Sequence, residues 1–176
     1  MGNIIGLKRG TVKLVSHNKQ WRDLFGKEKN RLLKVLPTKI IIDIQHAGST
    51  AIPDTKAKPI LDIAVGMKMA KDFKKVVKPL KKIGYRYVSE FSPKGRHLFI
   101  KGGSRVSSVH LHAIRYKGSH WFDLILFRDF LKDNKAWAKK YSQLKEKLYK
   151  QYKDDRPSYT SLKNSFIKNI IQRAKK

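Results

Sequence analysis

The 176-residue sequence contains no cysteine. This absence excludes disulfides, thiol catalysis and cysteine-based zinc or iron–sulfur sites. No apolar run approaches the roughly 20 residues that a membrane-spanning helix needs. Residues 1–10 also lack the apolar region of a secretory signal peptide. We therefore expect a soluble, cytoplasmic protein with no membrane span.

Acidic residues are scarce. The chain has 13 Asp+Glu against 41 Lys+Arg, which gives a formal net charge of +28. A field of this sign attracts polyanions such as nucleic acids and nucleotides, although a lysine-rich solvated surface has the same composition. Hydrophobic residues make up 40% of the chain, enough for a folded core. Nucleic acid is thus a candidate partner, and a disordered polycationic tail is excluded.

The positive charge avoids one segment. Residues 40–66 carry a net charge of −1, whereas lysines gather in the ranges 71–82 and 132–153. These lysines fall on the polar sides of predicted helices and are expected to be solvated, while the aromatic residues between them are expected in the core rather than stacked on bases. The least basic segment is the one with the strongest motif.

The hydrophobic pattern predicts helices and strands within a single domain, residues 1–176. Helices are expected at 19–36 and 70–83, and Pro79 should kink or end the second. Two apolar stripes in the C-terminal third predict a helical pair. The residues 121–127 are interpreted as a strand, or as a strand that runs into a helix. Further strands are expected at 40–44, 60–67, 85–89, 97–101 and 109–115.

The motif with the clearest chemistry begins where the first strand ends. Gly48 and Ser49 form a tight turn, and glycine lets the backbone approach a ligand closely. The backbone N–H groups and the Ser49 and Thr50 hydroxyls can cradle phosphate oxygens. Twelve residues separate Ser49 from Asp62, a lone carboxylate in an apolar strand. Such a carboxylate is costly to bury unless it is paired or binds a cation.

Two histidines add candidate ligands. His110 and His112 alternate with apolar residues, so both imidazoles face the same side of a strand. Such a pair can chelate a divalent metal, and His46 and Asp62 can complete the site if their strands are neighbours. The alternative is that the histidines are hydrogen-bonded structural groups or lie on an exposed face.

Basic residues near the motif can bind phosphate. Lys58 precedes the Asp62 strand, where it either reaches a phosphate or is solvated. Arg128 can hold a phosphate with its planar guanidinium, or it forms a structural pair with Asp129 or Asp62. Asp123 is a lesser candidate, as a further ligand or as the partner of a cation.

The Gly48–Ser49 turn followed by Asp62 resembles the nucleotidyltransferase superfamily. The resemblance implies a site in which two carboxylates on one strand hold Mg²⁺ ions. These ions align the nucleotide phosphates and activate an acceptor hydroxyl. The second carboxylate is missing here, because position 64 is alanine. A two-metal mechanism therefore cannot be inferred directly from this chain.

A second set of residues extends the motif along the chain: Trp21, Phe25, 46–53, 58–63, Gly84, Tyr85, Gly95, Arg96, 110–112, 127–131, Tyr141, Leu144, Lys145, Tyr159, Lys163, Phe166 and Ile167. On these residues the chain from about residue 11 onward resembles one group, the GrpB family. The resemblance implies an α+β (α/β) fold with a nucleotidyltransferase-like mixed β-sheet flanked by helices and a C-terminal helical pair. It also implies functional roles for His110 and His112. Arg96 fits the same pattern and either reaches a phosphate or is solvated, whereas Gln45 stands where members often carry glutamate. Tyr159 and Lys163 either close the candidate site from the C-terminal helix or only pack against other side chains.

Members of this family also occur fused to dephospho-coenzyme A kinase, which implies a nucleotide or coenzyme A context. We therefore expect a metal-dependent nucleotidyltransferase that acts on a nucleoside triphosphate or another phosphorylated small molecule. Asp62, His110 and His112 would be catalytic, and they would bind the metal with His46; Mg²⁺ or Mn²⁺ is expected, with Zn²⁺ as the alternative. The other hypotheses are a non-catalytic nucleotide- or nucleic-acid-binding module and a scaffold beside a nucleotide enzyme.

Overall fold

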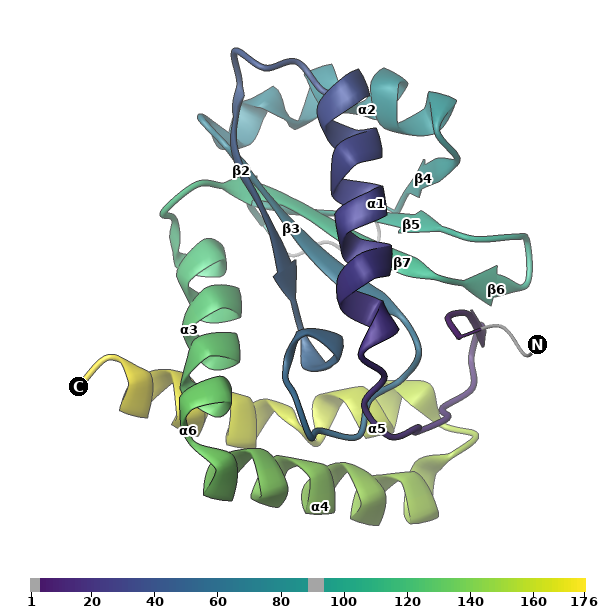
Figure 1. Cartoon of the computed structure of the whole chain (residues 1–176), viewed down its shortest axis with the longest axis vertical. Coiled ribbons are helices and arrows are strands. Elements are labelled where there is room, and N and C mark those ends of the chain that lie inside the picture. Colours follow the sequence, from purple (N-terminus) through teal and green to yellow (C-terminus); the bar gives the residue numbers. More distant parts are fainter. Residues whose placement is uncertain (1–3, 89–93) are drawn as a thin grey trace.

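A computed structural model describes residues 4–88 and 94–176 of the chain (Figure 1). Its main feature is a mixed five-stranded sheet in which β3 (Leu61–Met67) and β7 (Val109–Arg115) are parallel and the other neighbouring pairs are antiparallel. A smaller sheet pairs β1 (Leu7–Lys8) with β6 (Val106–Ser107). Across the main sheet the strands are, in order, β2 (Ile41–Ala47), β3 (Leu61–Met67), β7 (Val109–Arg115), β5 (Arg96–Lys101) and β4 (Tyr85–Tyr87).

One face of the sheet is covered by α1 (Gln20–Val35) and α2 (Phe73–Lys82), and Figure 1 shows α1 lying across the strands. The largest group of buried apolar side chains lies between these helices and the sheet. It includes Trp21, Leu32, Ile44, Ile63, Val65, Val76, Leu80, Phe99 and Leu111. Burial of these side chains supplies the main driving force for the layer, at about 25 cal/mol per Å² of apolar surface.

The opposite face is covered by α3 (Ser119–Asp133). Trp121 packs there on alanines of β2 and β3. A Cβ atom on Gly66 would lie 2.7 Å from the Trp121 ring, so the absence of a side chain at Gly66 allows this close approach. The interpretation of 121–127 as a strand is wrong, because a short apolar run does not separate a strand from a buried helix. Trp121 and Phe127 are buried while Phe122 is exposed, which is the pattern of an amphipathic helix.

The C-terminal third is helical and consists of α4 (Lys135–Tyr152), α5 (Arg156–Ser161) and α6 (Asn164–Ala174). The helix α5 starts at its N-cap Asp155, whose side chain accepts a 3.1 Å hydrogen bond from the backbone N–H of Ser158. Figure 1 shows these helices beyond the end of the sheet at which β2 finishes and β3 begins. They are joined to α3 and the loop after β2 by a cluster that includes Ile52, Phe127, Tyr141 and Ile170.

The predicted fold class, a mixed sheet flanked by helices with a C-terminal helical pair, is confirmed. Strand β2 continues three residues beyond the predicted end at residue 44. The 3₁₀ turn η2 (Ala70–Asp72) leads into α2. Pro79 does not end this helix, which continues to Lys82. Residue 89 of the predicted strand 85–89 lies outside the described residues. No helix among the described residues is long and apolar enough to cross a membrane.

The close approach of α3 to the sheet predicts a specific sensitivity at Gly66. The change Gly66→Ala should lower the free energy of unfolding by about 1–3 kcal/mol, because the added methyl group meets the rings of Trp121 and Tyr116. Gly103→Ala is the matched control, since a Cβ there meets nothing within 4 Å. Urea denaturation of both variants checks this, and equal stability of the two variants would contradict the packing argument.

Candidate functional site

Asp62 is placed by the pairing of β3 with β7. The parallel register sets Asp62 opposite His110 and Ala64 opposite His112, so the three polar side chains share one face of the sheet. The Asp62 Oδ1 atom lies 3.6 Å from His110 Nδ1 and 3.6 Å from His112 Nε2. The Asp62 side chain keeps 31% of its surface exposed. The structure therefore brings together the three residues predicted as catalytic and leaves the carboxylate accessible.

The two imidazoles and Arg96 set the charge state of this group. The Nε atom of Arg96 donates a 3.2 Å hydrogen bond to His112 Nδ1. The remaining ring nitrogen, Nε2, therefore carries the proton and points it toward Asp62. Burial, aided by the Arg96 charge, lowers the pKa of His112 to about 4, so this ring is neutral at pH 7. Burial opposes ionisation of Asp62, but its contacts with His110 and His112 hold its pKa well below the ordinary value.

The predicted phosphate turn lies directly against Asp62. Gly48 has φ +64°, and a Cβ atom at this position would overlap the Asp62 carboxylate. Glycine is thus required both by the backbone conformation and by the close packing. The 3₁₀ turn η1 (Ser49–Ala51) follows, and the Ser49 side chain lies beside the buried Tyr141. Thr50 is buried, and its hydroxyl lies 3.0 Å from His46 Nε2.

His46 is not brought to the Asp62 group. It pairs with Ile63 in the sheet and therefore faces the side opposite to Asp62. Its ring stacks on Phe25 of α1, with the ring centres 4.9 Å apart. Burial lowers the pKa of His46 to about 4. The geometry corresponds to a structural histidine rather than to the predicted fourth metal ligand.

Arg128 is engaged by protein groups. Its guanidinium donates to both carboxylate oxygens of Asp129 at 2.7 and 3.0 Å. It also donates to the Gln45 side chain and the His46 carbonyl, both at 2.9 Å. This is the structural pair with Asp129 that the sequence offered as the alternative to phosphate binding. Asp123 lies on α3 and influences Arg96 through its charge.

Four basic side chains from distant segments gather around the same end of the sheet. Lys58 lies in the loop before β3, Lys145 on α4, Arg156 on α5 and Lys163 at the start of α6. We call these four residues the cationic cluster. Burial and the neighbouring positive charges lower the pKa of Lys58 to about 7 and that of Lys163 to about 8. The same causes lower the pKa of the buried Lys145.

Sequence reasoning missed two of the four members of this cluster, Lys145 and Arg156. Lys58 and Lys163 were named as candidates, but Lys145 was assigned to a solvated helix face and is only 2% exposed. A signal was present, because Lys145 lies four residues after Tyr141 and three before Leu148, on the buried stripe of α4. A lysine at such a position is rarely buried without a specific partner.

The residues present fit only part of the predicted metal site. Among the described residues no group of three or more His, Asp or Glu side chains is arranged to hold an ion. His112 presents a proton rather than a lone pair to Asp62. Mg²⁺, by contrast, often binds through one or two carboxylates and substrate phosphates. The partly exposed carboxylate of Asp62 is compatible with that kind of binding, whereas a protein-only Zn²⁺ site receives no support.

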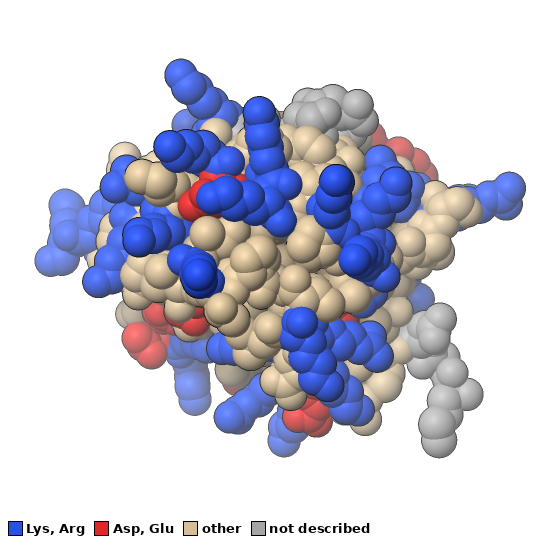
Figure 2. All heavy atoms as spheres, turned by 90° about the horizontal axis from the view of Figure 1, so that it is seen from above, with Lys and Arg blue, Asp and Glu red and all other residues tan. Residues whose placement is uncertain are grey.

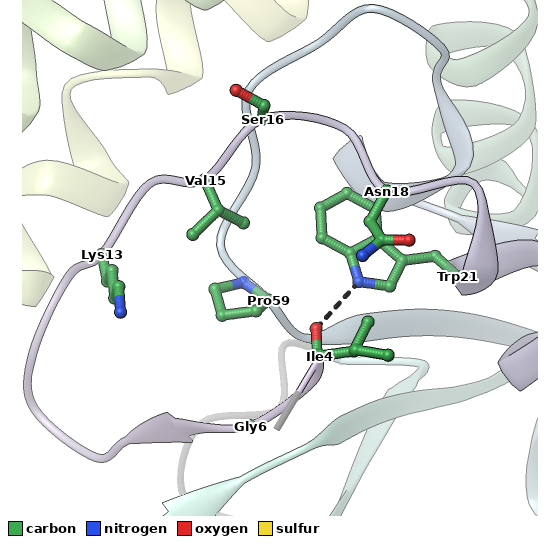
Figure 3. Close-up of a pocket in the computed structure, with 8 residues that line it drawn as sticks. All are labelled: Ile4, Gly6, Lys13, Val15, Ser16, Asn18, Trp21 and Pro59. Atoms are coloured by element: carbon green, nitrogen blue, oxygen red, sulfur yellow. Dashed lines mark hydrogen bonds between the residues drawn. The ribbon is translucent and has the colours of Figure 1, made fainter. Parts of the chain in front are cut away.

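A separate cavity lies near the N-terminal segment, with a volume of about 210 Å³ (Figure 3). Its lining combines apolar side chains with the polar residues Lys13, Ser16 and Asn18, and the Trp21 indole N–H donates a 3.1 Å hydrogen bond to the Ile4 carbonyl. Lys13 is the one titratable side chain among its lining residues, so the cavity offers no acid–base pair. The lining residues are Ile4, Gly6, Lys13, Val15, Ser16, Asn18, Trp21 and Pro59.

The fold and the site define an α+β protein with an ionised aspartate between two histidines beneath a Gly–Ser turn. Comparison with known proteins then gives the family: the chain belongs to the GrpB family, whose model, described as GrpB protein, matches residues 11–173. The resemblance inferred from the motifs is thereby confirmed at the level of the family.

Individual relatives agree with this assignment. The chain is 38% identical over 172 residues to the glutamate-rich protein GrpB of Alkalihalophilus pseudofirmus, covering 96% of this chain and 98% of the relative. It is 33% identical to UPF0157 protein YqkA of Bacillus subtilis, covering 94% of this chain and 48% of that protein. The crystal structure of conserved protein GrpB from Enterococcus faecalis superposes with a TM-score of 0.83 at 28% identity, covering 92% of this chain and 96% of the other.

The two histidines with low pKa values predict a pH-dependent stability. Their pKa is about 4 in the folded protein and 6.5 as the ordinary value, so the unfolded chain binds more protons between these limits. The free energy of unfolding should therefore fall as the pH drops from 6.5 toward 4. Urea denaturation at a series of pH values measures the slope. His46→Gln should give a shallower slope, and an unchanged slope would show that His46 does not contribute.

Proposed function

We propose that the protein binds a nucleoside triphosphate, or another phosphorylated small molecule, beside Asp62 and transfers a nucleotidyl or phosphoryl group to an acceptor. The observation that carries the proposal is the contact between the Gly48 turn and Asp62. It places an ionised, partly exposed carboxylate directly against the backbone of a Gly–Ser turn. This combination fits a ligand whose phosphates are held next to a cation or an acceptor hydroxyl.

The low pKa of Asp62 favours one role over another. A carboxylate that is hard to protonate is a weak general base, but it remains a good ligand for a cation at neutral pH. We therefore assign Asp62 to a Mg²⁺ or Mn²⁺ ion that accompanies the phosphates. When bound, such an ion would neutralise phosphate charge. His110 and His112 are positioning residues that act by keeping Asp62 ionised and fixed.

The phosphate-binding roles are distributed unequally among the predicted residues. Ser49 contributes a hydroxyl next to Tyr141, and Lys58 contributes a half-buried ammonium group. Thr50 and Arg128 already have protein partners, so we assign them to support of the turn and of β2. Arg96 fixes the His112 ring and lies on the same face as Asp62.

A second function, ligand binding without transfer, is favoured by Ala64. The residue that would supply the second carboxylate is a fully buried alanine in the apolar cluster under Trp121. One carboxylate is compatible with recognition of a phosphorylated ligand. The family relationship does not decide between transfer and binding, so the two functions must be separated by assay.

Nucleic acid is the ligand that the net charge of +28 favours for a binding module. Figure 2 shows Lys and Arg side chains spread over the whole of one face rather than gathered in a stripe. A scattered distribution is less suited to tracking a phosphate backbone than a continuous stripe. Binding to RNA or DNA across a salt series tests this partner, because a steep log–log slope is the mark of counterion release. A flat slope would reject it.

The proposed transfer is tested with labelled nucleoside triphosphates and Mg²⁺ or Mn²⁺ across pools of acceptors. Asp62→Asn should reduce transfer by about a hundredfold, because the amide cannot hold the cation charge. Asp133→Asn, at the exposed end of α3, is the control for a lost acidic residue and should leave transfer unchanged. Equal activity of wild type and Asp62→Asn would contradict the role of Asp62. Nucleotide binding without any transfer would reject the transferase and support the binding module.

A further inference from the structure

The cationic cluster has little to neutralise it within the protein. Lys145 is 2% exposed and Lys163 is 8% exposed. Within residues 4–88 and 94–176, none of the cluster's four members forms an ion pair with a carboxylate. Asp62 is the acidic group whose charge is felt by Lys58, Arg156 and Lys163. One carboxylate cannot balance four basic groups, so full protonation of the cluster is unfavourable until an anion supplies further negative charge.

Hydrogen bonding within the cluster is also incomplete. The Lys145 ammonium group donates to the Lys56 carbonyl, which leaves two of its three protons available. Lys58 and Lys163 lie over the same aromatic ring, with their Nζ atoms 5.4 and 4.3 Å from the centre of Tyr159. These cation–π contacts hold the ammonium groups in place but use none of their protons.

Tyr159 gives an independent indication of a missing ligand. Its side chain is fully buried, and its hydroxyl has no hydrogen-bond partner in the part of the chain that the structure describes. Buried hydroxyl groups in folded proteins nearly always have a partner. A hydroxyl donor on the ring that Lys58 and Lys163 contact is matched by a multiply charged oxygen-rich anion, because such an anion supplies acceptors and negative charge together.

We propose that the cationic cluster and the Tyr159 hydroxyl form a binding subsite for the polyphosphate part of the ligand. The loop before β3 supplies one side of this subsite through Lys58. The helices α4, α5 and α6 supply the other side through Lys145, Arg156, Tyr159 and Lys163. A chain of two or three phosphates extending from the Asp62 side would meet several cations at once. This inference rests on the proposed function for its ligand class and specifies the part of the ligand that is recognised.

The subsite is tested by calorimetric titration of the 176-residue chain with inorganic tripolyphosphate in the presence of EDTA. Chelation removes divalent ions, so binding then depends on the protein's own cations. Wild type should bind saturably. Lys163→Gln should weaken binding at least about tenfold, since a charge-assisted hydrogen bond is lost. Lys168→Gln is the matched control, because this lysine is exposed on the same helix and loses the same charge.

Two further measurements separate binding from a structural role. Tyr159→Phe keeps the ring under the lysines and should still weaken tripolyphosphate binding severalfold. Lys163→Gln should leave the melting temperature of the free protein unchanged or raised, because it removes an uncompensated charge, while reducing the rise in melting temperature that tripolyphosphate causes. A structural lysine would instead lower the melting temperature without the probe.

The outcomes distinguish the subsite from the transfer reaction. Absence of saturable binding by wild type would overturn the subsite, and so would equal weakening by Lys163→Gln and Lys168→Gln. Selective loss in Lys163→Gln and Tyr159→Phe would support it. Binding of tripolyphosphate together with no nucleotidyl or phosphoryl transfer would leave the subsite standing and reject the transferase.

Discussion

Parallel hydrogen bonding between β3 and β7 sets Asp62 opposite His110 and Ala64 opposite His112. Side chains alternate between the two faces of a strand, so a shift of β3 by one residue would turn Asp62 into the apolar layer under α1 and α2. The apolar residues on the other face, Ile63 and Val65, hold the register because they are buried there. The position of the carboxylate therefore depends on the core that lies behind it.

The parts of the structure that the sequence predicts are those governed by local periodicity. The alternation around His110 and His112 placed both rings on one face, and the Gly48 turn was expected beside the strand of Asp62. The first helix and most strands follow from apolar spacing in the same way. These features depend on neighbours a few residues away, and their physical cause can be seen in a short stretch of sequence.

Features that depend on packing between distant segments were harder to predict. His46 was grouped with Asp62 from its place at the end of a strand, but alternation along β2 turns it toward Phe25. The apolar run at 121–127 belongs to a helix, and its Trp121 packs against Gly66 of the distant strand β3. Lys145 looked solvated because lysine usually is, and its burial depends on the loop that contains Lys56.

The bond from Lys145 to the Lys56 carbonyl joins α4 to the loop between β2 and β3. The two sides of the proposed subsite therefore belong to segments that lie about 90 positions apart in the chain. Separation of the C-terminal helices from the sheet would divide the subsite, and a ligand that bridges both sides would oppose that separation. Binding of a ligand in the subsite and attachment of these helices to the sheet are thus thermodynamically coupled. Local opening at this boundary should be the motion that a bound anion suppresses most.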